Sequence, residues 1–159
     1  MSIFIHDTRD KLGKHKNVDD YLLQKGHKII RSKLYVGDLT LLMDQHICID
    51  LKRDISELAT DVCQDHKRFR EELQRAYEAE INLVILVENR DGINDLSELP
   101  RWVNPRAVNS PLAPNGERIF KICRAMSGAY FASFQFCHPG AAGRVCEEIL
   151  LSGKYRRVF

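Results

Sequence analysis

The stretch Ile81-Asn82-Leu83-Val84-Ile85-Leu86-Val87 decides the fold class of this 159-residue chain. Its almost wholly apolar composition is expected for a central strand whose two faces are both covered by helices. Residues 66–79 just before it carry apolar side chains at helical spacing, and a helix that leads into a buried strand makes a crossover connection. The chain is therefore predicted to be an α/β protein with a mixed sheet.

Farther upstream, residues 46–52 read His-Ile-Cys-Ile-Asp-Leu-Lys, with an apolar residue at every second position. Strand alternation predicts that these apolar residues face a core, while Asp50 and Lys52 lie side by side on the opposite face. Residues 37–43 predict a second strand next to Asp38, and a short turn would join the two strands into a hairpin. Asp38 would then lie across from Asp50.

Two carboxylates on neighbouring strands suit Mg²⁺ or Mn²⁺, which take hard oxygen ligands and complete their shell with water and phosphate oxygens. In such a site, Lys52 would stabilise a water molecule that attacks the phosphate group, or help to activate it. Spacing alone leaves a second interpretation open, in which Asp50 and Lys52 form an ordinary exposed ion pair worth about 0–1 kcal/mol.

The other elements follow from periodicity and turn residues. Further strands are predicted at 3–7, 27–34 and 131–136, and helices at 18–25, 55–62, 66–79, 116–130 and 141–151. We expect strands 27–34, 37–43 and 46–52 to form a meander. Residues 89–115 are rich in Asn, Pro and Asp, and predict a lid, a substrate-contacting loop or a surface excursion.

The amino-acid composition limits which classes of protein this chain can belong to. With 44% hydrophobic and 29% charged residues, the chain is an ordinary globular protein of one domain. No signal peptide or bilayer-long apolar run is visible, so we expect a cytoplasmic protein without a membrane partner. Five widely spaced cysteines without a C-x-x-C pair predict reduced core residues instead of a disulfide framework or a structural zinc site.

Four motifs in chain order resemble the XPF-type family of structure-specific endonucleases, whose pattern reads D-x-R-E, G-D-Y and E-R-K before a helix. They are Asp7-Thr8-Arg9-Asp10, Gly37-Asp38-Leu39, Asp50-Leu51-Lys52 and the helix that contains Arg68-Phe69. The resemblance covers residues 3–88. Residues 102–106, 119–126 and 134–137 resemble shorter versions of this domain found in phage and prophage genomes.

This resemblance implies a restriction-endonuclease-like fold, with a mixed central sheet flanked by helices. Residues 1–159 would form a single nuclease domain, with core motifs at 3–88, a long loop at 89–115 and a C-terminal helix-strand-helix at 116–152. The implied activity is Mg²⁺- or Mn²⁺-dependent hydrolysis of DNA in recombination, replication or repair. DNA is the implied partner; a homodimer and contacts with phage or host DNA-processing proteins would also fit.

The resemblance also implies roles for individual residues. Asp38 and Asp50 are the implied metal ligands, the backbone carbonyl of Leu51 is available to the same ion, and Lys52 takes the lysine role. Asp7 and Arg9 match the first motif, which implies a place beside the metal or the scissile phosphate. Weaker candidates for supporting or DNA-contacting roles are Asp10, Lys14, Arg68 and Glu72.

Some positions depart from the family pattern. Asp50 replaces a glutamate, Leu51 an arginine, Leu39 a tyrosine and Asp10 a glutamate, so substrate contacts are expected to differ while the metal ligands persist. Arg68 and Glu72 stand four residues apart, which also fits a simple helix-surface pair. His6 is expected to be a packed or edge histidine.

The alternative function is a nuclease-like module that binds DNA or a protein without cutting, and RNA as a substrate also stays open. Retention of Asp38 and Asp50 favours cleavage, because a module freed from catalysis has no need to hold two carboxylates together against their repulsion.

Overall fold

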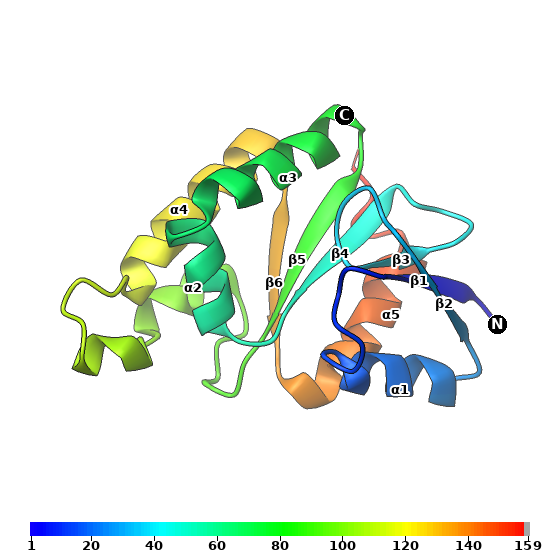
Figure 1. Cartoon of the computed structure of the whole chain (residues 1–159), viewed down its shortest axis with the longest axis horizontal. Helices are drawn as coiled ribbons and strands as arrows, with labels where there is room; N and C mark the ends of the chain where they lie inside the picture. The colour runs from blue at the N-terminus through cyan, green and yellow to red at the C-terminus, as the bar shows by residue number, and fades with distance from the viewer. Residues whose placement is uncertain (158–159) are drawn as a thin grey trace.

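The computed structural model describes residues 1–157, which form one mixed six-stranded sheet between two layers of helices (Figure 1). The strands are β1 (Ile3–Asp7), β2 (Lys28–Ser32), β3 (Leu39–Leu41), β4 (Ile47–Lys52), β5 (Asn82–Glu88) and β6 (Ser133–Cys137). The helices are α1 (Lys16–Gln24), α2 (Ile55–Cys63), α3 (His66–Glu78), α4 (Gly116–Tyr130) and α5 (Ala142–Ser152). Short 3₁₀ helices are η1 (Leu96–Arg101), η2 (Pro105–Val108) and η3 (Pro139–Ala141).

The strand order in the sheet is β2-β1-β3-β4-β5-β6. β1 pairs in parallel with β2 and antiparallel with β3, β3 and β4 are antiparallel, and β4, β5 and β6 run in parallel. The α/β class, the mixed sheet and the hairpin of β3 and β4 are therefore confirmed.

The predicted meander is wrong at its first strand. β2 lies at the edge of the sheet beside β1, because α1 joins these two strands and a helical crossover leads to parallel pairing. β1 instead occupies the position next to β3, with Phe4 opposite Leu41. Residues alternate between exposed and partly buried along β2, and Lys28 and Arg31 suit a sheet edge.

The two faces of the sheet form two apolar cores. Helices α2, α3 and α4 cover one face, and α1 and α5 cover the other (Figure 1). Along β4, Ile47, Ile49 and Leu51 pack in the core with α1 and α5, as the alternation predicts. Asp50 and Lys52 therefore project toward α2 and α3.

Residues 89–115 form an anchored segment. Ile93, Leu99 and Trp102 are buried in the core with α4, and the Asn104 side chain donates a hydrogen bond of 2.8 Å to the Pro114 carbonyl. None of the residues that line the candidate active site below comes from this segment. The role of this segment as a lid, a substrate-contacting loop or a surface excursion stays a prediction.

All five cysteines are free thiols and four of them are buried, as predicted for core residues. Burial raises the pKa of Cys48 to about 11 and that of Cys123 to about 12. Within residues 1–157, no helix combines the length and the apolar character that crossing a membrane requires.

Candidate active site

Asp38 and Asp50 meet at the end of the β3–β4 hairpin. The backbone N–H of Asp38 donates to the Ile49 carbonyl oxygen at 2.7 Å, and Asp38 Oδ2 accepts a hydrogen bond of 2.8 Å from the backbone N–H of Leu51. Burial and the neighbouring Asp50 carboxylate raise the pKa of Asp38 well above its ordinary value. The structure thus brings the two predicted metal ligands together.

Lys52 lies between two carboxylates on neighbouring elements. Its Nζ is 2.8 Å from Asp50 Oδ1 and 2.6 Å from Asp61 Oδ2 of α2, and it stands 5.3 Å from the centre of the Phe69 ring. Burial alone would lower the pKa of Lys52, but Asp50 and Asp61 raise it well above its ordinary value. Asp50 is 4% and Lys52 7% exposed, so the interpretation as an exposed ion pair is wrong.

The first motif supports Asp38 from β1. The backbone N–H of Asp7 donates to the Asp38 carbonyl oxygen at 2.8 Å. The Asp7 carboxylate accepts hydrogen bonds from the Leu34 backbone at 3.2 Å and from Arg9 Nε at 2.8 Å. The guanidinium of Arg9 also donates to the Leu34 carbonyl at 2.7 Å, while the Arg9 side chain stays half exposed. Asp7 therefore positions its neighbours, and Arg9 is accessible to a ligand.

Asp10 belongs to a buried polar group around His6. The two ring nitrogens of His6 are 2.7 Å from Asp10 Oδ2 and 2.9 Å from Asp19 Oδ1. Burial opposes a charge on His6, yet the two carboxylates raise its pKa to about 9. The hydrogen bond from His6 lowers the pKa of Asp10 against the effect of burial. The packed histidine is confirmed. Lys14 borders this group, with its Nζ 3.9 Å from Asp10 Oδ1 and 2.9 Å from Glu57 Oε1.

Glu72 and Arg68 both lie on α3 but contact different partners. Glu72 Oε1 accepts a hydrogen bond of 2.9 Å from the backbone N–H of Gly37, and burial together with Asp50 raises the pKa of Glu72. Arg68 is exposed and pairs with Asp65 at 3.5 Å. The helix-surface pair of Arg68 and Glu72 is therefore wrong, and Glu72 supports the glycine that precedes Asp38.

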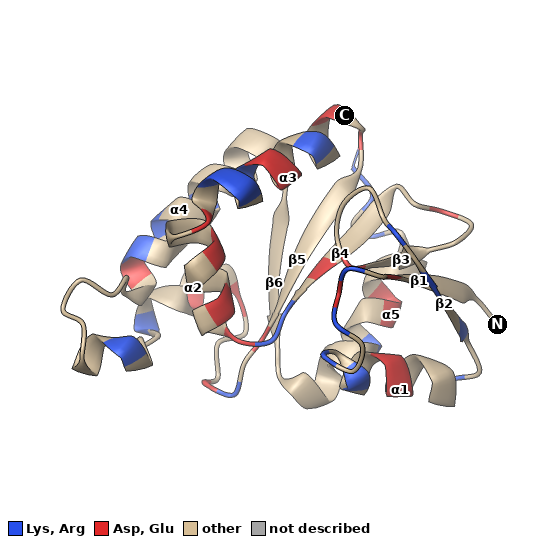
Figure 2. Ribbon diagram, viewed as in Figure 1, with Lys and Arg blue, Asp and Glu red and all other residues tan. Residues whose placement is uncertain are grey.

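A cavity of about 350 Å³ collects all of the predicted site residues. They line it together with Gly37, Glu57, Asp61, Phe69 and Arg75. Figure 2 shows acidic positions on β4 and α2 close to one another, whereas α3 carries both charges. Buried carboxylates and a rim with exposed arginines can hold a cation within reach of a phosphate group.

Sequence reasoning missed Glu57 and Asp61 on α2. They stand four residues apart, so they share one helix surface, and this helix directly follows the strand that carries Asp50. That spacing was an available signal. His15 carried no comparable signal, because only the packing of α1 brings it to this end of the sheet.

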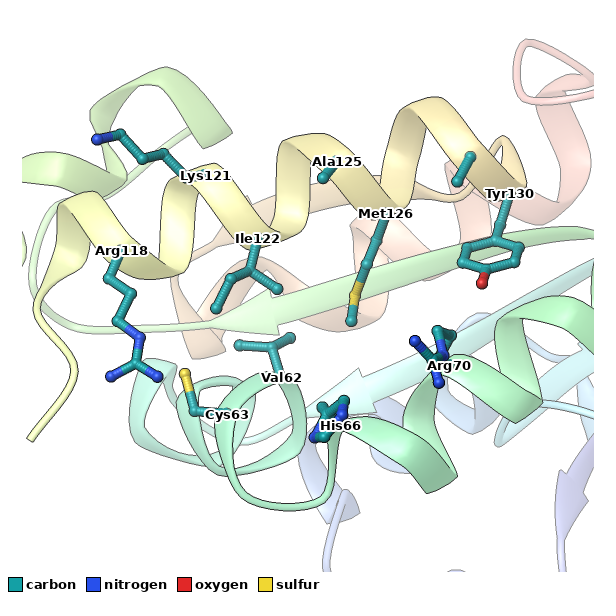
Figure 3. Close-up of a pocket in the computed structure, with 11 residues that line it drawn as sticks. Val62, Cys63, His66, Arg70, Arg118, Lys121, Ile122, Ala125, Met126 and Tyr130 are labelled. Carbon is teal, nitrogen blue, oxygen red and sulfur yellow. The ribbon is translucent and has the colours of Figure 1, made fainter.

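A larger cavity of about 620 Å³ lies between α4 and the pair α2 and α3 (Figure 3). Val62, Ile122 and Met126 supply apolar surface, and Arg70 and Arg118 also line it. None of the described residues in its lining carries a carboxylate. This groove suits apolar contact, and the smaller cavity is the one equipped for a cation and a phosphodiester.

The sequence matches no family model, and no curated protein matches it. Among solved structures, XPF from Aeropyrum pernix matches with a TM-score of 0.66 and 20% identity, over 96% of this chain and 65% of that chain. XPF from Aeropyrum pernix in complex with DNA matches with a TM-score of 0.68 and 19% identity, over 100% of this chain and 68% of that chain. The chain has an XPF-like fold. The predicted restriction-endonuclease-like architecture is thereby confirmed, for a chain that spans about two thirds of the solved XPF chains.

Among the buried carboxylate oxygens of residues 1–157, one has no hydrogen-bond partner. Asp50 Oδ2 is buried and has no hydrogen-bond partner among residues 1–157, although Asp38 stands beside it. A buried, unpaired carboxylate oxygen is costly, and a divalent cation would supply the missing interaction to both acids. The residues present therefore fit Mg²⁺ or Mn²⁺.

Proposed function

We propose that this chain is a divalent-metal-dependent DNA endonuclease that hydrolyses phosphodiester bonds in DNA recombination, replication or repair. The observation that carries the proposal is the unpartnered Asp50 Oδ2 beside Asp38, in a cavity that also contains Lys52. XPF from Aeropyrum pernix has been solved in complex with DNA, and the shared fold supports DNA as the substrate.

Asp38, Asp50 and the Leu51 backbone carbonyl would hold the ion. A bound Mg²⁺ or Mn²⁺ would polarise the phosphoryl oxygens and make a nearby water more acidic. The Leu51 side chain is buried in the core with α1 and α5, so it anchors the strand while its backbone borders the cavity.

Lys52 serves as a permanent cation in this proposal. Because Asp50 and Asp61 raise its pKa, the ammonium group stays protonated at neutral pH and is a poor general base. It can instead donate a hydrogen bond to the attacking oxygen or stabilise negative charge that develops on the phosphoryl group. Asp61 acts as a positioning residue that holds the ammonium near Asp50.

The rim residues would bind the DNA backbone. Arg9 is held at one side by Asp7 and Arg68 is exposed at the other, and both line the cavity. Guanidinium groups bind phosphate oxygens in a bidentate manner. A homodimer, contacts with phage or host proteins and a preference for particular DNA structures belong to the same proposal.

A cleavage assay tests the proposal. Purified chain is incubated with labelled single-stranded, duplex, flap and four-way-junction DNA in Mg²⁺ or Mn²⁺, with EDTA as the metal-free arm. We expect cutting that requires the metal, is lost in Asp50→Asn and persists in Asp91→Asn, a control that removes an exposed acid outside the cavity. DNA binding without cutting in either metal would contradict the proposal and support the non-cleaving module.

A further inference from the structure

His15 carries a buried imidazole close to Asp10 and Asp38. It precedes α1, its side chain is 0% exposed, and neither ring nitrogen has a hydrogen-bond partner within residues 1–157. A buried polar group without a partner costs about 1–3 kcal/mol. Such a side chain needs a ligand to offset this cost.

The surroundings of His15 are acidic. Its Nε2 lies 3.6 Å from Asp10 Oδ2, and its Nδ1 lies 3.6 Å from Glu88 Oε2. Both distances exceed those of good N–H···O hydrogen bonds, which are about 2.7–3.2 Å. Asp10, His15 and Asp38 each offer a ligand atom, and these atoms all lie within 4.8 Å of one another.

We propose that Asp10, His15 and Asp38 form a second cation site, distinct from the pair of Asp38 and Asp50, that takes a divalent transition metal such as Mn²⁺. Ligand atoms at about 2.1 Å from one ion are about 3.0 Å apart at neighbouring positions and about 4.2 Å apart at opposite ones, so side-chain shifts of about 1–2 Å would complete the site. An imidazole ligand favours a transition metal, whereas Mg²⁺ prefers oxygen ligands alone.

Glu88 completes the arrangement from the end of β5. Its Oε1 accepts a hydrogen bond of 2.6 Å from the Asn17 side chain, which directs Oε2 toward His15 Nδ1. Metal-binding histidines commonly present their second N–H to a carboxylate, which fixes the tautomer and leaves the other nitrogen free for the metal. Here Nε2 faces Asp10, and a metal bound to it would leave the Nδ1–H to donate to Glu88 once the 3.6 Å gap between them shortens.

Asp38 is shared between the two sites. An ion in either site would therefore offset part of the repulsion between the Asp38 carboxylate and the acid beside it. The second site rests on His15 and its neighbours, and it stands whether or not the chain cuts DNA.

Mn²⁺ binding to the full chain tests the proposal without an activity assay. Free Mn²⁺ is measured by electron paramagnetic resonance, and pulsed spectra of the bound ion report coupling to an imidazole nitrogen. We expect two Mn²⁺ per chain and a nitrogen coupling that changes when histidine is labelled with ¹⁵N. Saturating Mn²⁺ without any imidazole coupling in the wild-type chain would overturn the proposal, even if every variant failed to fold.

Variants show which histidine gives rise to the nitrogen coupling. His15→Asn should remove it and weaken one of the two ions at least tenfold, whereas His66→Asn, a change at an exposed histidine outside both sites, should keep it. Asp50→Asn should keep the nitrogen-coupled ion and weaken the other. Coupling that survives His15→Asn would refute this site, while loss of DNA cutting with coupling retained would bear only on the nuclease proposal.

Discussion

Asp38 Oδ2 accepts a hydrogen bond of 2.8 Å from the backbone N–H of Leu51. This bond ties the carboxylate before β3 to the backbone of β4, one residue beyond Asp50. The two acids are therefore held together by the hairpin itself, and the raised pKa of Asp38 reflects its burial and, after that, this enforced proximity. In the proposed function, a bound cation would relieve the repulsion between the two acids.

Asp38→Asn should separate metal binding from folding. The amide oxygen can still accept the Leu51 hydrogen bond, and the repulsion with Asp50 is gone, so the melting temperature in EDTA should be unchanged or higher. Cutting should fall at least a hundredfold. At a Mg²⁺ concentration of 100 times the Kd, the free energy of unfolding of the wild-type chain should rise by about 2.7 kcal/mol. This rise should be much smaller in the variant. Equal stabilisation of both chains by Mg²⁺ would refute Asp38 as a ligand.

Lys52→Met should destabilise the fold strongly. Removing the ammonium leaves Asp50 and Asp61 buried without their partner, and breaking a buried ion pair in this way costs about 3–5 kcal/mol. Urea unfolding measures the change. Lys16→Met, at an exposed lysine of α1, should stay within about 0.5 kcal/mol of wild type. Adding Asp61→Asn to Lys52→Met should recover part of the loss without restoring DNA cutting.

His6 should make the fold less stable at alkaline pH. The folded-state pKa of His6 is about 9, above the ordinary value of 6.5, so the protonated ring stabilises the fold fully below about pH 6.5. This contribution is lost as the pH rises through about 9, and its size is at most about 3 kcal/mol. The free energy of unfolding, measured from pH 6 to 10, should fall over this window. A His6→Gln chain that shows the same fall would contradict the assignment.

Gly37→Ala should disturb the site more than an equivalent change elsewhere. Gly37 has φ +73°, and an added Cβ would lie 3.0 Å from the Ile49 carbonyl oxygen and 3.2 Å from Cys48 Cβ. Gly92 has φ +75° with nothing within 4 Å of its Cβ position, so Gly92→Ala carries the backbone strain alone, about 1–2 kcal/mol. We expect Gly37→Ala to cost more than this and to reduce cutting, because Asp38 follows directly. Equal losses of stability in the two variants would show that the close contact is harmless.

Much of the fold can be predicted from short stretches of consecutive residues. The apolar run of β5, the alternation of β4 and the helical spacing of α3 and α4 each arise from a few consecutive residues, and these elements form as predicted. The hairpin also follows from local pattern, because a short turn leaves its two strands little choice of partner. The meeting of Asp38 and Asp50 could therefore be predicted before the structure.

Other relationships depend on residues far apart in the chain. The place of β2 was set by its pairing with β1 across α1, a choice that no local pattern encodes. Glu72 reaches Gly37 across 35 residues, and Glu88, in the second half of the chain, reaches His15 near the start of it.

The sequence by itself thus determined the α/β class, the hairpin and the acids that it joins, because periodicity and turn length act over neighbouring residues. Only the tertiary structure decided the strand order, the burial of Lys52 between Asp50 and Asp61, and the approach of His15 to Asp10 and Asp38. Those contacts arise only when separate helices pack on the sheet.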